Sequence, residues 1–63
     1  MLPNTTYDLA EQLSQESKSL WRIENEYIQN AEGNGELTTF WKEMKKDKEQ
    51  HITRITELLK KEL

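Results

Sequence analysis

The sequence predicts an all-α fold, an antiparallel hairpin of two helices. The only two glycines of the 63-residue chain, Gly33 and Gly35, lie near its midpoint. On either side of them, apolar residues recur at helical spacing over roughly 27 residues without an internal proline. Because the segment between the two periodic stretches is short, the helices must be antiparallel neighbours. The whole chain, residues 1–63, is expected to form one domain.

The first helix is predicted over residues 6–32. Thr5 and Asp8 fit a capping box, in which the Thr5 hydroxyl accepts a hydrogen bond from the backbone and Asp8 reaches back. The apolar stripe of this helix consists of Leu9, Leu13, Leu20, Tyr27 and Ala31. Its intermediate positions are filled by Glu16 or Ser17, and by Glu24. Beside the stripe lie Trp21, Ile23 and Ile28, which widen the apolar face.

The turn is predicted at residues 33–35 and the second helix at 36–62. Gly33 suits the left-handed position just past a helix end, and Asn34 can cap the next helix. The stripe of the second helix consists of Leu37, Phe40, Trp41, Met44, His51, Ile55 and Leu58, with Ile52 and Leu59 beside it. Residues 45–50, in the middle of this helix, include no apolar side chain.

Composition excludes several classes of function. The net charge is −3 with both signs interspersed, which argues against nucleic acid or an anionic membrane as the partner. There is no cysteine, and no apolar run is long enough for a membrane span or a secretory signal. We therefore expect a cytoplasmic protein. No phosphate-binding loop or nucleophilic motif accompanies the serines and the single histidine, so we expect no enzymatic activity and no cofactor.

A chain this short rarely buries enough surface to be stable alone, and without cysteine oligomerisation is the common remedy. The apolar residues are also too widely spread for one two-helix seam. We therefore expect a homodimeric four-helix bundle, or a larger assembly, that acts through self-association or by binding another protein. The predicted interface comprises Leu20, Trp21, Tyr27, Ile28, Phe40, Trp41, Met44, Ile52, Ile55 and Leu59. The aromatic residues beside the turn either pack internally or offer a hot spot to a protein partner.

Folding about Asn34 places residues equally distant from the turn at the same height. Tyr27 then faces Trp41, and Ser17 faces His51. The same geometry predicts a polar layer between two apolar ends, because charged and polar residues occupy the middle of both stripes. Its members are Glu16, Ser17, Glu24, Asp47, Lys48 and His51. Buried charges must be paired or liganded, so the layer requires an explanation.

Two interpretations of the polar layer remain open. In the first, Lys48 pairs with Glu16, Glu24 or Asp47, and His51 bonds to Ser17 or to a carboxylate, which fixes the helix registry. In the second, Glu16, Glu24 and His51 bind iron or zinc, with Glu16 and His51 of two chains converging on one ion.

An inward Glu on the first helix, neighbouring aromatic residues and an inward His on the second give the chain a pattern that resembles half of a ferritin-like or rubrerythrin-like bundle. The resemblance extends from Thr5 to Leu63. It implies a metal-binding helical bundle in which a Glu of the first helix and a Glu-x-x-His motif of the second hold the metal. His51 matches the histidine of this motif, and Lys48 stands where the motif has its glutamate.

Overall fold

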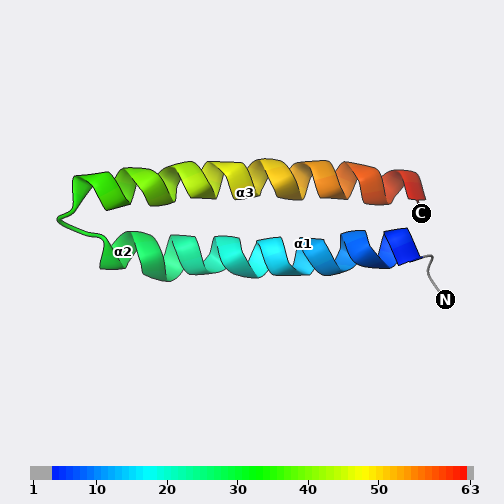
Figure 1. Cartoon of the computed structure of the whole chain (residues 1–63), viewed down its shortest axis with the longest axis horizontal. Coiled ribbons are helices and arrows are strands. Elements are labelled where there is room, and N and C mark those ends of the chain that lie inside the picture. The colour runs from blue at the N-terminus through cyan, green and yellow to red at the C-terminus, as the bar shows by residue number, and fades with distance from the viewer. Residues whose placement is uncertain (1–3, 63) are drawn as a thin grey trace.

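The computed structural model describes residues 4–62, which form an antiparallel helical hairpin (Figure 1). The first arm consists of α1 (Asn4–Arg22), a π-helical segment η1 (Ile23–Tyr27) and a short α2 (Ile28–Asn30). The second arm is the single helix α3 (Gly35–Glu62). The prediction of an all-α hairpin is confirmed. Of the predicted domain, residues 1–3 and Leu63 lie outside the described part.

The first arm begins at Asn4, two residues before the predicted start. Thr5 and Thr6 therefore lie inside the first helical turn, and no side-chain hydrogen bond of a capping box forms there among the described residues. Threonine is tolerated in the first turn because the N–H groups of that turn have no hydrogen-bond acceptor within the helix. Thr6 is also drawn inward, since it lies three residues before Leu9 on the same face and is buried.

The π-helical turn η1 changes the phase of the first arm. The Ile28 N–H bonds to the Ile23 carbonyl, five residues back, so this turn holds one more residue than an α-helical turn. At its start the side-chain amide of Asn25 donates to the Trp21 carbonyl at 2.8 Å. Ala31 lies eight residues after Ile23, a step that would turn it about 80° away from Ile23 in a regular helix. The extra residue brings Ala31 back toward the inward face, where both side chains are buried.

The hinge occupies residues 31–34 and matches the predicted chemistry. Gly33 has a φ of +89°, a conformation that glycine adopts without the strain a side chain would cause. The Asn34 side-chain oxygen accepts a hydrogen bond from the Leu37 N–H at 3.1 Å, as expected for a helix cap. Across the hinge, the Thr38 hydroxyl donates to the Ala31 carbonyl at 3.1 Å. These bonds hold the two arms side by side at this end.

The core between the arms is narrow. Within residues 4–62, the buried apolar side chains are Ile23, Ala31 and Ile55. Two predictions about this seam were wrong. Ile23, placed beside the stripe, is only 1% exposed, whereas Glu24, placed within it, is exposed. Inward positions in the first arm alternate in steps of three and four from Thr6 to Tyr27, and Ile23 continues that alternation where Glu24 would break it.

The second arm also buries a narrower stripe than predicted. Trp41, Met44, Ile55 and Leu58 are at least half-buried, and so are Ile52 and Leu59, which were expected beside the stripe. Leu37 and Phe40, by contrast, remain 47% and 48% exposed. A helix that touches one neighbour can cover only one narrow seam, and here Trp41 fills it near the hinge.

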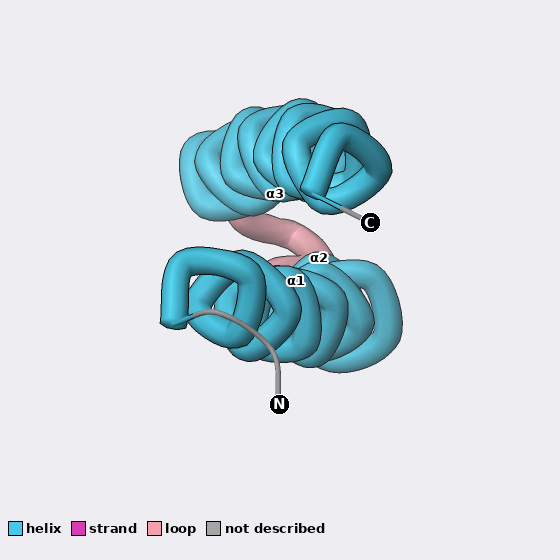
Figure 2. The backbone as a smooth tube through the Cα atoms, turned by 90° about the vertical axis from the view of Figure 1, so that its right-hand side faces the viewer, coloured by secondary structure: helices cyan, strands magenta, loops and turns pink. Residues whose placement is uncertain are grey.

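The two arms form a single layer (Figure 2). Seen from the end that carries the first turn of α1 and the last turn of α3, the helices lie one beside the other, and no third element within residues 4–62 covers either side. The hairpin is correspondingly long and thin, with extents of 48 × 16 × 12 Å. Both faces of the layer are therefore open to solvent or to a partner.

A candidate polar centre and aromatic patch

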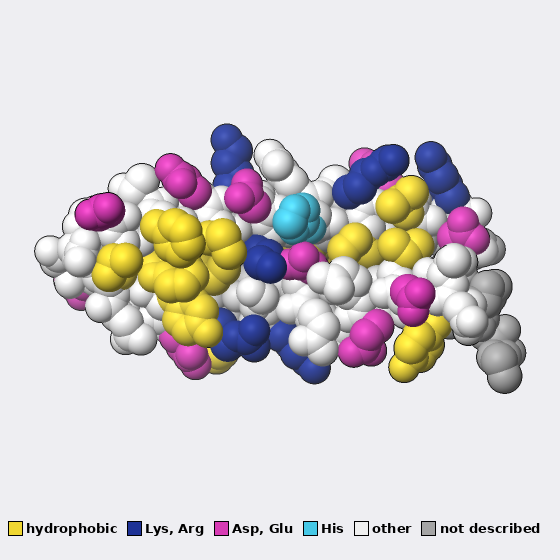
Figure 3. Space-filling view, in the orientation of Figure 1, with side chains coloured by type: hydrophobic (Ala, Val, Ile, Leu, Met, Phe, Trp, Pro, Cys, Tyr) yellow, Lys and Arg dark blue, Asp and Glu magenta, His cyan; other side chains and the backbone are white. Residues whose placement is uncertain are grey.

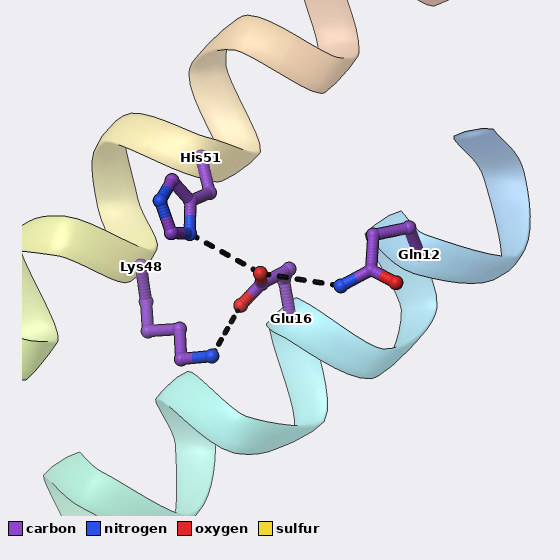
Figure 4. A network of polar contacts seen from close by, with 4 residues as sticks. All are labelled: Gln12, Glu16, Lys48 and His51. Carbon is purple, nitrogen blue, oxygen red and sulfur yellow. Dashed lines mark hydrogen bonds and ion pairs between the residues drawn. The ribbon is translucent and has the colours of Figure 1, made fainter.

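Glu16 organises the middle of the hairpin (Figure 4). It projects from α1 toward α3, where Lys48 and His51 lie one helical turn apart on the facing side. One carboxylate oxygen, Oε2, lies 2.7 Å from Lys48 Nζ. The other, Oε1, lies 3.2 Å from His51 Nδ1 and 3.3 Å from Gln12 Nε2, which donates to it. We call these four residues the polar centre.

Exposure differs sharply within the polar centre. The Glu16 side chain is 8% exposed, that of Lys48 is 21% exposed and that of His51 is 56% exposed. A buried carboxylate is costly unless charged or polar donors surround it. Glu16 has such donors from both arms, and the Lys48 ammonium is itself largely covered. Breaking the Glu16–Lys48 pair should therefore cost more stability than breaking a surface ion pair.

The pKa of Glu16 lies below its ordinary value of 4.5. The main cause is the hydrogen bond from the Lys48 ammonium, which favours the ionised carboxylate. Burial acts in the opposite direction, while the Gln12 amide, the positive charge of Lys48 and the His51 contact reinforce the lowering. Glu16 is therefore an anion at neutral pH, and the centre holds a balanced pair of charges.

The sequence interpretation of this layer is correct for three residues and wrong for three. Glu16, Lys48 and His51 meet, as the pairing hypothesis predicts. Ser17, Glu24 and Asp47 are exposed and do not join them. The Glu24 carboxylate instead lies 3.9 Å from Lys45 Nζ at the surface. The reason is the helix phase: Glu16, and not Ser17, occupies the inward position, so it meets both Lys48 and His51.

Gln12 is the member of the centre that sequence reasoning missed. Its spacing of four residues from Glu16 was the available signal, because side chains at i and i+4 are neighbours on a helix. On its own this signal is weak, since many polar pairs in the chain have the same spacing. It gains meaning only once Glu16 is known to face inward.

The donor set of one chain does not fit a ferritin-like metal site. Within residues 4–62, no three His, Asp or Glu side chains converge as metal ligands would. Glu16 and His51 lie together, Glu24 lies apart from them, and the Lys48 ammonium occupies one carboxylate oxygen. A second chain would have to supply further ligands and Lys48 would have to move. The predicted iron or zinc site stays a prediction.

A second feature is an aromatic patch at the hinge end, made of Tyr27, Leu37, Phe40 and Trp41. The Tyr27 and Trp41 rings are 4.8 Å apart, which confirms the predicted pairing across the two arms. Phe40 meets Trp41 edge-on at 5.0 Å. An open hollow beside them is lined by Tyr27, Asn30, Ala31, Leu37 and Trp41.

Figure 3 shows one face of the hairpin, with the single histidine near the middle of its length. Hydrophobic side chains gather over both arms toward the hinge, and a second, smaller group lies toward the opposite end. Basic, acidic and His side chains separate the two groups. This face thus alternates apolar, polar and apolar along its length, as the sequence predicted for the layer between the arms.

Comparison of the chain with models of protein families, with curated proteins and with solved structures yields no match. None of the helices within residues 4–62 has an apolar stretch long enough to cross a membrane. The resemblance to ferritin-like bundles therefore stays a prediction, and a proposal for function must come from the geometry of the hairpin.

Proposed function

We propose that this chain is a non-enzymatic, self-associating protein whose hairpins pair through their apolar face to form a four-helix bundle. The supporting observation is the thin core: three apolar side chains are buried within residues 4–62, while Leu37, Phe40 and Trp21 are about half exposed. The chain exposes 4926 Å². A compact monomer of this mass exposes roughly 4,200 Å².

The excess of several hundred Å² is comparable to what one partner contributes to a standard protein interface, about 800 Å². An elongated layer of two helices produces this excess because neither of its faces is covered. A second copy can cover one face of each hairpin at once, since a two-fold axis presents the same surface from both sides. The predicted homodimer follows from this geometry more directly than a pairing with an unrelated protein.

The aromatic patch is the proposed anchor of the interface. Trp41 already contacts both Tyr27 and Phe40, so less side-chain freedom remains to be lost on binding. Residues of this kind dominate the affinity of protein interfaces when a partner excludes water from them. The polar centre contributes in a different way: its contacts are made within one chain, so it adds little affinity and instead penalises pairings in which it would meet apolar residues.

Sedimentation equilibrium of the intact chain and of Phe40→Glu tests the proposal. Dimers are expected for the unmodified chain at micromolar concentration. In the variant, a charge within the patch should weaken association by about tenfold or more, the equivalent of about 1.4 kcal/mol. Thr39→Glu adds the same charge at the neighbouring exposed position and should leave association nearly unchanged. A folded monomer of the unmodified chain at these concentrations would refute the proposal.

Metal binding between two copies is the second candidate. It is favoured by the 3.2 Å contact between Glu16 and His51 and by the 56% exposure of the His51 side chain, which a second chain could approach. Elemental analysis of untagged protein tests it. A stoichiometric transition metal that disappears in His51→Ala, but persists in the exposed control Gln50→Ala, would support this candidate. Metal-free dimers would leave self-association as the function and remove metal binding.

A further inference from the structure

We infer that the two hairpins pack antiparallel, so that the hinge end of one lies beside the open end of its copy. The inference rests on the proposed self-association and adds the orientation of the partner. Three observations carry it: the distribution of charge along the hairpin, the central position of the polar centre, and the different apolar residues at the two ends.

Charge is unevenly distributed along the hairpin. Residues 23–44, which form the hinge end, carry five carboxylates and one lysine, a side-chain charge of −4. The carboxylates are Glu24, Glu26, Glu32, Glu36 and Glu43, and all of them are exposed. The remaining residues carry seven carboxylates and eight lysines or arginines, a charge of +1. Lys45, just outside this range, lies 3.9 Å from Glu24. The hinge end is therefore acidic, and the rest of the hairpin is close to neutral.

Orientation decides which of these ends meet. Parallel pairing would place two acidic hinge ends within a bundle about 20 Å wide, since packed helices lie about 8–10 Å apart. At physiological ionic strength the screening length is about 8 Å, so much of this repulsion would persist between neighbouring arms. Antiparallel pairing lowers this repulsion, because each acidic hinge end then lies beside a less charged part of the copy. Like charges brought together are an effective device against the wrong partner arrangement.

The polar centre lies where a perpendicular two-fold axis can pass through it. Lys48 is in the middle of α3, which runs from Gly35 to Glu62. Antiparallel pairing about this level therefore superposes the two polar centres while it exchanges the two apolar ends. Any shift along the axis would push Glu16 or Lys48 against apolar residues of the copy, which is costly. The centre thus makes antiparallel pairing compatible with full overlap of the hairpins.

The apolar residues of the two ends complement each other in size. The hinge end presents the rings of Tyr27, Phe40 and Trp41. The described part of α3 beyond the polar centre contributes only aliphatic side chains, namely Ile52, Ile55, Leu58 and Leu59. Cores pack evenly when large side chains face smaller ones. The α1 side of the open end carries one ring, that of the exposed Tyr7. Antiparallel pairing sets the three rings of the hinge end against the aliphatic segment of α3, whereas parallel pairing would gather the hinge rings of both chains at one end.

The absence of native cysteine makes a direct test possible. Single cysteines for spin labels are introduced at exposed positions of the hinge, the middle and the open end: Glu32→Cys, Glu49→Cys and Lys60→Cys. Pulsed electron resonance then measures distances between the labels of two chains. Circular dichroism and sedimentation of each labelled variant establish that helicity and dimer formation are retained.

Antiparallel pairing predicts long distances, roughly 40 Å for a helix of this length, between two hinge labels and between two open-end labels. A mixture of hinge-labelled and open-end-labelled chains should add a short distance. Short hinge-to-hinge and open-to-open distances, with no short distance in the mixture, would overturn the orientation while the dimer stands. Absent coupling at Glu49→Cys together with a monomer by sedimentation would refute the proposed self-association itself, and the inference with it.

Discussion

The polar centre and the hinge end of the hairpin differ in how their side chains are shielded from water. Glu16 at the centre receives partners on both carboxylate oxygens from within its own chain. The aromatic patch at the hinge has internal ring contacts and still leaves Leu37 and Phe40 about half exposed. In the proposed dimer, affinity and registry would therefore depend on separate regions of the chain.

The largest effect is expected at the hinge end. Trp41→Ala should lower the free energy of unfolding by about 3 kcal/mol, because a half-buried ring that contacts two others is removed. Urea denaturation at several protein concentrations measures this loss. Thr39→Ala, an exposed position in the same helix, serves as the control and should change stability by less than about 0.5 kcal/mol. Equal losses in the two variants would contradict the assignment of the patch.

The next effect is expected at the centre. Glu16→Ala should destabilise the fold by about 2 kcal/mol, because the largely covered Lys48 ammonium loses its partner. Glu24→Ala breaks the exposed pair with Lys45 and should cost less than about 1 kcal/mol. Thermal unfolding followed by circular dichroism compares the two variants. If Glu24→Ala cost as much as Glu16→Ala, the distinction between a buried and a surface pair would fail.

A double substitution tests whether the polar centre sets the registry of the hairpins. Glu16→Leu combined with Lys48→Met replaces the pair by apolar side chains and should alter stability by less than about 1.5 kcal/mol, in either direction. Its expected effect is on uniqueness, because shifted pairings are no longer penalised. Native mass spectrometry should then detect several oligomers where the unmodified chain gives one. A single oligomer in the double variant would mean that the centre does not set the registry.

The smallest effect concerns pH. Because the folded state lowers the pKa of Glu16, the resulting stability is present above the unfolded pKa and is lost as pH falls through the folded value. The free energy of unfolding should therefore decline on acidification below about pH 4.5. Glu16→Gln should flatten the acid side of this profile, whereas Glu24→Gln should leave it nearly unchanged. Parallel profiles for the unmodified chain and Glu16→Gln would contradict the prediction.

The turn and the helix cap were predictable from the sequence, but the set of residues that face inward from each helix was predicted only in part. Gly33 and Asn34 act as expected because their roles depend on backbone conformation and on one nearby N–H group. The pairing of Tyr27 with Trp41 followed from distance to the hinge alone. Ile23 and Glu24, however, were exchanged between core and surface, since a position one residue away differs by about 100° around a helix. The alternation of three- and four-residue steps that includes Leu9, Leu13 and Leu20 selects Ile23, whereas the prediction continued four residues beyond Leu20 to Glu24.

The π-helical turn could not be predicted, because it arises from competition between phase and packing in the first arm. It has a consequence for tolerance to changes in chain length. The first arm carries one residue more than a regular helix would need between Ile23 and Ala31, so removal of Asn25 would restore an ordinary helical turn and keep both residues on the inward face. The helix α3 contains no extra residue of this kind. A deletion within it would therefore rotate every residue beyond the deletion away from the seam. Length variation in this protein should therefore be accepted in one arm and rejected in the other.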